Sequence, residues 1–421
     1  MDEAPPRPPV RLVGSDELAR SRLTVFFRLL LAIPHFLWLA LWGIAATVVA
    51  FVLWIATLVS GRPPRELHAF VAAYVRYSAH LAAWFNLAAN PYPGFSGAPG
   101  YPIDVEIDPP APQRRLTVAF RLVLALPVLL LATVISSGFS APGGWLATAA
   151  IGGGIVSTAA FLAWFACLVL GRMPAGLQAI VTYCVGYGAQ ATAYMLLVTD
   201  RYPNSRPGLV EPLPVLPNHP VRIDVREGTR RSRLTVFFRL LLALPHFVWL
   251  TLWSVPAFLA AIAAWIVALV LGRVPSPLHR FLAAFVRYTS HVFAFTFLVG
   301  GPFPGFAGTQ GSYPIDVEID PPTHQRRLVS LFRLLLAFPA LLLASALGAA
   351  LYVVAFLGWW AALATGRMPR GLRDLGAAAI RYNAQTYAYL LLVTPRYPYA
   401  SPVLEGRVPE PALPEPEAAP A

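Results

Sequence analysis

Four arginines hold equivalent places in this 421-residue chain, each a few residues inside a long apolar run and six residues before a proline. They are Arg28, Arg121, Arg239 and Arg333. A guanidinium binds phosphate through two hydrogen bonds, so an anion or lipid-headgroup site is one interpretation. Each arginine lies one or two turns from the start of its run. Its side chain can therefore also reach the headgroups as an anchor, or pair with a nearby carboxylate. We favour the anchor.

Three further arginines precede an aromatic residue in a later segment of the chain, and they are Arg76, Arg287 and Arg381. In the first of these segments Arg76 falls at helical spacing with His80 and Trp84, on one polar and aromatic face. We take these three arginines, together with the four above, as candidates for contact with anionic lipid.

Two short segments alternate acidic and apolar residues, which is typical of a half-buried strand. Their acidic residues are Asp104, Glu106 and Asp108 in one segment and Asp316, Glu318 and Asp320 in the other. A row of carboxylates could hold a divalent cation. The related segments carry Arg11, Arg222 and Arg226, so we favour cross-strand charge pairs. We predict that the four strands form one small sheet.

Six of the eight histidines occur as matched pairs: His35 with His246, His68 with His279, and His80 with His291. Paired histidines could bind a metal or relay protons. The sequence supplies neither a helical His-x-x-x-His spacing nor a nucleophile–histidine–acid set. We therefore expect histidines at the membrane interface, no metal, no cofactor, no catalytic residue and no enzymatic activity.

The composition is that of a membrane protein. The chain is 57% hydrophobic and 12% charged, whereas soluble proteins are about a quarter charged. All basic residues except histidine are arginine, and the net charge is +12. The arginines border apolar runs instead of gathering on one face, which argues against a nucleic-acid partner. Two cysteines, Cys167 and Cys184, both lie in apolar runs and exclude a disulfide framework.

The chain divides into two tails and four repeats, arranged as a duplicated pair. The divisions are a tail at 1–9, repeat A at 10–100, repeat B at 101–214, repeat A′ at 215–311, repeat B′ at 312–403 and a tail at 404–421. Both tails are rich in Pro, Ala and Glu, and we predict them to be disordered. A proline-rich linker at 212–220 joins the two halves.

Each repeat contains a short strand, a long apolar run that ends in Gly-Arg-x-Pro, and a third helix. The run from Leu23 to Ser60 would be about 57 Å long as a single helix, nearly twice a hydrocarbon core of about 30 Å. Turn-forming residues interrupt the run in repeats B and A′. We therefore predict a transmembrane hairpin in each repeat, broken near Gly43, Gly138, Ser254 and Gly348.

A hairpin would place the arginines at both ends of the run, such as Arg22 and Arg62, on one side of the membrane. The positive-inside rule makes that side cytoplasmic. Repeat B keeps the same arginine pattern, so we favour a third helix that is amphipathic and interfacial, or re-entrant. The expected fold is an all-α polytopic membrane protein with eight spans, a four-stranded cytoplasmic sheet and both termini cytoplasmic. A crossing third helix would give twelve spans.

The repeated motifs resemble a bacterial membrane family. The resemblance rests on Phe26–His35, on Gly61-Arg62 with the following proline, on Arg76-Tyr77 and on Val198–Pro203. These are similar to domain of unknown function 4389 (DUF4389), common in actinobacteria, in tandem copies across 10–400. Repeat B departs from the pattern with Gly186 in place of arginine. The resemblance implies membrane location, and it implies no reaction and no catalytic residue.

We expect an integral plasma-membrane protein of unassigned activity, acting as a structural or regulatory component that contacts anionic lipid headgroups. The alternative is a transporter or channel for a lipid-like or apolar substrate, built on the duplicated halves. The centres of the runs are almost wholly Leu, Ala, Val and Trp, which argues against a hydrophilic substrate. The sequence leaves homo- or hetero-oligomerisation open.

Overall fold

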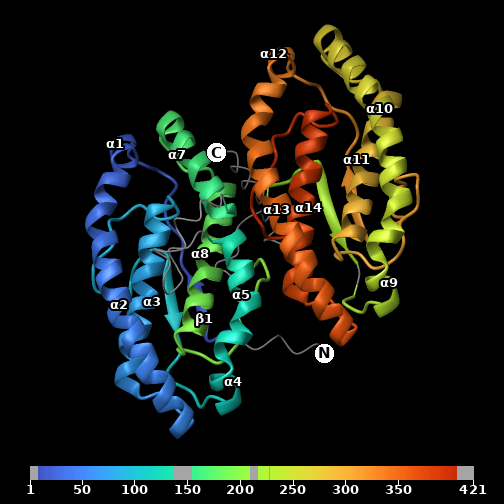
Figure 1. The fold of residues 1–421 in the computed structure, drawn as a ribbon. Coiled ribbons are helices and arrows are strands. Elements are labelled where there is room, and N and C mark those ends of the chain that lie inside the picture. Colours follow the sequence, from blue (N-terminus) through green and yellow to red (C-terminus); the bar gives the residue numbers. More distant parts are fainter. Residues whose placement is uncertain (1–7, 137–153, 209–216, 227, 405–421) are drawn as a thin grey trace, which may run out of the picture.

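A computed structural model describes residues 8–136, 154–208, 217–226 and 228–404. The chain forms two halves that lie side by side (Figure 1). The first half contains β1 (Val10–Val13), α1 (Arg22–Phe26), α2 (Arg28–Ser60), α3 (Arg65–Phe85), β2 (Asp104–Ile107), α4 (Arg115–Ala119), α5 (Arg121–Ile135), α7 (Ile155–Leu170) and α8 (Ala175–Met195). The second contains β3 (Val221–Val225), α9 (Arg233–Phe237), α10 (Arg239–Leu271), α11 (Ser276–Thr296), β4 (Ile315–Ile319), α12 (Arg327–Leu331), α13 (Arg333–Thr365) and α14 (Arg370–Leu390).

The predicted hairpin is wrong in three repeats. There the apolar run forms one continuous helix, and α2, α10 and α13 each have 33 residues. All three are long and apolar enough to cross a membrane. The expected breaks at Gly43, Ser254 and Gly348 lie inside these helices. A glycine within a helix costs only about 1 kcal/mol, whereas a turn in apolar surroundings would leave several backbone groups without partners.

Some predictions fall outside the described residues. In repeat B the expected break near Gly138 lies within 137–153, between α5 and α7. Most of both tails and much of the linker lie at 1–7, 405–421 and 209–216, which are also outside.

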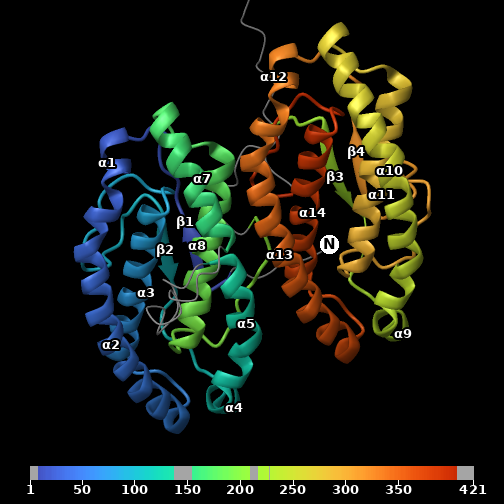
Figure 2. The same ribbon diagram turned by 45° about the horizontal axis from the view of Figure 1, so that its top comes forward.

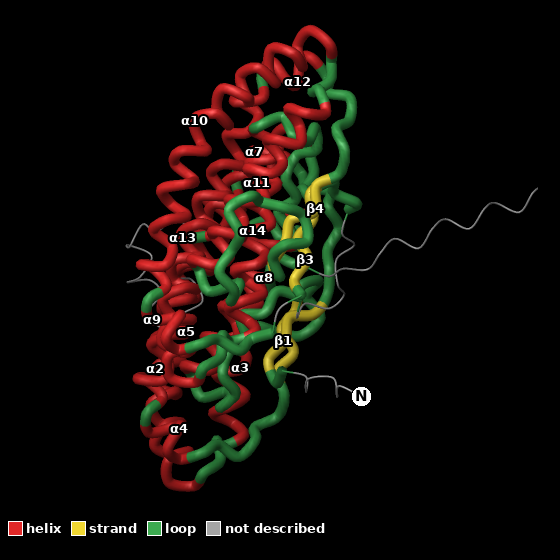
Figure 3. Tube along the Cα trace, turned by 90° about the vertical axis from the view of Figure 1, so that its right-hand side faces the viewer, coloured by secondary structure: helices red, strands yellow, loops and turns green. Residues whose placement is uncertain are grey.

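The third helices form a buried middle layer, and their predicted interfacial or re-entrant position in the membrane stays a prediction. Helix α3 packs against α8, and α11 against α14. Their buried residues lie on several sides of each helix, not on a single stripe. Small residues allow the close packing, as where a Cβ at Gly376 of α14 would lie 2.5 Å from a methyl group of Val299. The long helices and the strands cover this layer from its two sides (Figure 3).

The strands form two separate sheets instead of the predicted four-stranded one. β1 pairs antiparallel with β2, and β3 pairs antiparallel with β4, one pair in each half (Figure 2). The predicted charge pairs across neighbouring strands are present. Arg11 lies 2.5 Å from Glu106, and Arg222 lies 2.8 Å from Asp320. Each sheet joins the two repeats of its own half. Helices and loops connect the halves, as where Arg206, in the loop after α8, lies 3.2 Å from Asp374 of α14.

The two repeats of each half run in opposite directions. The Gly61 carbonyl, at the end of α2, accepts a hydrogen bond from the Gln113 N–H at 2.9 Å, just before α4. At the other end of this half the Gly171 carbonyl accepts one from the Arg20 N–H, also at 2.9 Å. Each long helix therefore ends where the neighbouring repeat begins. Arginines consequently lie at both ends of each half and are not gathered on one side, as a hairpin would have placed them.

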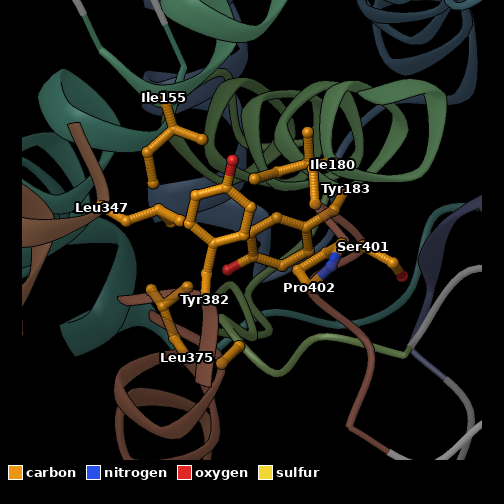
Figure 4. A pocket seen from close by; sticks show the side chains of 10 residues that line it. Ile155, Ile180, Tyr183, Leu347, Leu375, Tyr382, Ser401 and Pro402 are labelled. Carbon is orange, nitrogen blue, oxygen red and sulfur yellow. The ribbon is translucent and has the colours of Figure 1, made fainter. Parts of the chain in front are cut away.

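The halves meet where α13 packs against α5 and α7. A small cavity lies at this junction, lined by apolar side chains and by Tyr183 and Tyr382 (Figure 4). Its volume is about 10 Å³, which is room for about one water molecule. This part of the junction is therefore closely packed.

Candidate functional site

Each repeat contains an arginine clasp, in which the first arginine of the long helix grips the end of the third helix. In repeat B, Arg121 Nη1 donates to the carbonyls of Tyr194 at 3.1 Å and Thr199 at 2.8 Å. Its Nη2 donates to Gln113 Oε1 at 2.7 Å, and its guanidinium lies 4.3 Å from the Tyr194 ring centroid. Helix C-termini leave carbonyls without intrahelical partners, so the arginine supplies the missing donors.

Repeat B′ repeats this arrangement closely. Arg333 donates to the carbonyls of Tyr389 at 2.6 Å and Thr394 at 3.0 Å, and to Gln325 Oε1 at 2.8 Å. Its guanidinium lies 4.5 Å from the Tyr389 ring centroid. The planar fork of arginine can serve several acceptors at once, which a lysine ammonium would do less well.

The clasps of repeats A and A′ use a second arginine where B and B′ use glutamine. Arg28 donates to the Trp84 carbonyl at 2.7 Å and Arg239 to the Gly300 carbonyl at 2.5 Å. Arg20 donates to the Ala88 carbonyl at 2.9 Å, and its counterpart Arg231 binds the matching carbonyl in A′. Two cations thus share one site in these repeats.

Each clasp also holds a leucine in a left-handed backbone conformation. The four residues and their φ values are Leu87 at 69°, Leu197 at 61°, Leu298 at 65° and Leu392 at 60°. Such a conformation costs about 1–3 kcal/mol for a residue other than glycine. The leucine carbonyls accept hydrogen bonds from Arg20, Gln113, Arg231 and Gln325 respectively. The clasp therefore stabilises a strained turn.

The four clasp arginines are only 2–3% exposed. They do not lie at the strand carboxylates, which was one of the interpretations, but at backbone carbonyls. The geometry supports a structural role, and contact with a lipid headgroup stays a prediction.

The other three candidates are tied to loops and strands. Arg76 donates to the Val105 carbonyl at 3.0 Å and Arg287 to the Val317 carbonyl at 2.9 Å. Arg381 donates to the carbonyls of Ser401 and Val403. The first two contacts join a buried third helix to a strand, and the contacts of Arg381 join α14 to the segment that follows it.

All three histidine pairs have partners within the fold. His68 Nε2 and His279 Nε2 each lie 3.0 Å from a backbone carbonyl oxygen, of Val198 and Val393. His80 Nε2 lies 2.7 Å from Asp104 Oδ1, and His291 Nε2 lies 2.7 Å from Asp316 Oδ1. His35 and His246 each lie 2.8 Å from a tyrosine hydroxyl, of Tyr77 and Tyr288. These histidines are buried within the fold instead of facing headgroups. The described residues contain no group of three or more potential His, Cys, Asp or Glu metal ligands.

Further hydrogen bonds hold Asp104 and Asp316, the acidic partners of His80 and His291, in position. Asp104 also accepts hydrogen bonds from the N–H groups of Gly100 and Val105. Burial alone would raise the pKa of this carboxyl, but the bonds from His80 and the two N–H groups outweigh it and lower the pKa. The same balance lowers the pKa of Asp316.

Exposed arginines lie at the ends of the apolar helices. From the sequence, such arginines serve only to assign the cytoplasmic side of the membrane, and they are not named among the candidate site residues. Arg22, Arg233 and Arg327 each donate to a carbonyl in the last turn of a neighbouring apolar helix, at 3.0, 3.0 and 2.8 Å. The three accepting helices are α7, α13 and α10 respectively. Positive charge is favourable at a helix C-terminus. We call the exposed arginines at these ends the rim arginines: Arg22, Arg62, Arg114, Arg115, Arg172, Arg230, Arg233, Arg273, Arg326, Arg327 and Arg367.

Four tryptophans also connect the repeats, and no sequence signal separated them from membrane-facing tryptophans. Their indole N–H groups donate to carbonyls of the short helices α4, α1, α12 and α9. The pairs are Trp54 to Val118, Trp164 to Val25, Trp265 to Ser330, and Trp359 to Val236. Each tryptophan thus ties its long helix to the other repeat of the same half.

A cavity of about 270 Å³ lies at the start of α9. Its lining includes Arg230, Arg231, Ser232, Thr235 and Arg239. Three of these residues are arginines, and Arg231 and Arg239 also donate to backbone carbonyls of the clasp. The candidate Arg239 therefore borders a space that a ligand could enter.

The repeats, the long apolar helices and the arginine-rich ends together fit a membrane protein of unassigned activity. The chain belongs to the family described as domain of unknown function (DUF4389), whose model matches four tandem segments. The matched segments are 22–96, 145–205, 233–305 and 327–401. No curated protein matches the chain, and no solved structure matches it.

Proposed function

We propose that this protein is a structural or regulatory component of the cell membrane that contacts anionic lipid. The observation that carries the proposal is the outer surface of the long helices. From Leu29 to Val59 the exposed side chains of α2 are apolar apart from Thr47, whose hydroxyl binds the Gly43 carbonyl of its own helix. Such a surface is too extensive to face water.

Charge at the ends of this surface supports the lipid partner. The rim arginines lie where the apolar surface stops, and arginine at such borders pairs with anionic headgroups. The cavity at Arg230, Arg231 and Arg239 offers a place for a headgroup phosphate. Repeat A has Ala19 where repeat A′ has Arg230, which makes the A′ site the more basic of the two at that position.

The lipid preference can be measured as thermal stabilisation. The full-length protein is purified in a neutral detergent and unfolded by heat with added phosphatidylglycerol or phosphatidylcholine. A ligand that binds only the folded state raises the melting temperature, and we expect the larger rise with phosphatidylglycerol. Changing Arg22, Arg115, Arg233 and Arg327 to glutamine should remove that difference and leave the melting temperature without lipid nearly unchanged.

The matched control changes two arginines on the strand face, the half-buried Arg11→Gln and the exposed Arg222→Gln. This variant should keep the full response to phosphatidylglycerol. Equal stabilisation by the two lipids in the unchanged protein would refute the lipid contact. Inorganic phosphate as effective as phosphatidylglycerol would point instead to a free anion. Release of the protein from membranes by alkaline carbonate would refute membrane integration itself.

The transporter alternative finds less support. A path on the axis between the halves requires space and polar groups there. The cavity near that axis holds about 10 Å³, and its lining is mostly apolar. We therefore retain the structural role as the proposal.

A further inference from the structure

We infer that the protein lies flat in one leaflet of the bilayer, with its long helices parallel to the membrane plane. The partner of the long-helix surface would then be the acyl and headgroup region of a single leaflet. This inference rests on the proposed membrane function and specifies its geometry. Three independent features of the structure support it.

The first feature is length. A helix of 33 residues is about 50 Å long, whereas the hydrocarbon core is about 30 Å thick. To fit the core, α2 would need a tilt of about 53°, beyond the usual range of about 0–40°. Its exposed surface stays apolar to both ends, with Leu29 67% and Val59 71% exposed. A helix close to the bilayer normal would extend beyond the hydrocarbon core and expose much of that apolar surface to water.

The second feature is the division of the molecule into an apolar and a charged face. The long helices lie on one side of the buried third helices, and the strands lie on the other (Figure 3). The strand side carries the ion pairs of Arg11 with Glu106 and of Arg222 with Asp320, whose side chains are 24–51% exposed. A protein that spans a bilayer needs an apolar belt around its whole girth. Opposite apolar and charged faces suit a protein bound at one surface.

The third feature is the symmetry of the arginines. Because the repeats of each half run in opposite directions, Arg22 and Arg172 lie at one end of the first half, and Arg62 and Arg115 lie at the other. Upright helices would place half of these arginines outside the cell, against the positive-inside rule. In the flat arrangement both ends lie at the same depth, and all rim arginines can reach the headgroups of one leaflet.

The test measures depth along α2 with nitroxide labels at Leu30→Cys, Leu41→Cys and Val52→Cys. These residues are 61%, 63% and 47% exposed, and neighbouring labels lie about 16 Å apart along the helix. The native Cys167 and Cys184 are buried and can remain in place. The labelled full-length protein is reconstituted in vesicles of phosphatidylcholine and phosphatidylglycerol. Collisions with oxygen and with a water-soluble nickel complex report the depth of each label.

A flat protein should give the same depth at all three positions, about 5–10 Å below the headgroups. A label at Glu318→Cys, on the strand face, should be exposed to water. A spanning helix would place the Leu41 label near the bilayer centre and the other two at shallower depths, which would overturn the inference. Membrane retention of the same samples is measured by carbonate extraction. Retention together with a spanning profile would refute the flat arrangement alone, and loss of retention would refute both proposals.

Sidedness provides a second readout that does not depend on depth. Ser21→Cys and Ser60→Cys place thiols at exposed positions near the two ends of α2. An impermeant maleimide should label both in the same population of sealed vesicles, either right-side-out or inside-out. Labelling of one thiol in each population would show that the helix crosses the membrane.

Discussion

His291 Nε2 lies 2.7 Å from Asp316 Oδ1, and both side chains are only 1% exposed. The equivalent His80 and Asp104 also lie 2.7 Å apart in the other half, so in each half this contact joins the A-type repeat to the B-type repeat. It joins a buried third helix to a strand, α11 to β4 in one half and α3 to β2 in the other.

The His291–Asp316 contact predicts how stability depends on Asp316. Asp316→Asn should lower the free energy of unfolding by roughly 2–3 kcal/mol, because hydrogen bonds to a buried carboxylate lose their charge. Thermal unfolding in detergent measures the change. The matched control is Asp320→Asn, whose carboxylate is 40% exposed and should cost at most about 1 kcal/mol. Equal losses in the two variants would contradict the role given to the buried contact.

The same carboxylates predict a dependence on pH. The pKa values of Asp104 and Asp316 are lowered in the folded protein, so their ionised forms stabilise the fold above the unfolded value of about 3.9. That contribution is lost as the pH falls below about 4, through the lowered pKa values. As the pH is lowered from about 6 to about 3, the melting temperature should fall less steeply for Asp316→Asn than for the unchanged protein. Parallel curves would contradict the prediction.

Gln325 should be essential to its clasp. It is 1% exposed, accepts from Arg333 and donates to the Leu392 carbonyl. Gln325→Leu removes both hydrogen bonds and leaves two buried polar groups without these partners. Each loss should lower the free energy of unfolding by about 1–3 kcal/mol. A clear drop in melting temperature is expected. Thr323→Leu, an exposed change two residues away, should have little effect, and a similar drop there would show that the loop is merely intolerant of leucine.

Variants of Arg333 and Arg327 should distinguish an arginine that stabilises the fold from one that binds lipid. Arg333→Gln removes a buried guanidinium from three acceptors, so we expect a loss of about 3 kcal/mol or more. Arg327→Gln changes an exposed rim arginine and should cost less than about 1 kcal/mol, while weakening the response to phosphatidylglycerol. Unfolding curves with and without this lipid distinguish the two. The opposite pattern would restore Arg333 as the lipid ligand.

Gly308 has no room for a Cβ atom, whereas the nearby Gly305 has. Gly308 has φ of +59°, and a Cβ there would lie 2.3 Å from the Ala284 carbonyl oxygen. Gly308→Ala should therefore destabilise the protein by about 3 kcal/mol or more. Gly305→Ala meets no atom within 4 Å and should be nearly neutral. Equal melting temperatures for the two variants would show that the loop adapts to the added methyl group.

The sequence alone determined the membrane class, the four repeats and the charge pairs between neighbouring strands. These follow from local information, because composition and repetition need no knowledge of distant contacts. The family match confirms the repeats in four segments. The strand pairs followed because opposite charges recur at matching positions of neighbouring repeats.

Only the tertiary structure decided whether each long run is one helix or two. The hairpin prediction rests on the length of the run, taken to stand upright in the bilayer, and on the turn-forming residues in repeats B and A′. Gly43, Ser254 and Gly348 are tolerated within helices because hydrogen bonding along the helix outweighs a weak local preference for a turn. Likewise, Arg28 looked like a surface anchor from its position in the run. The carbonyl it binds, at Trp84, lies 56 residues away, and no local pattern indicates a partner at that distance.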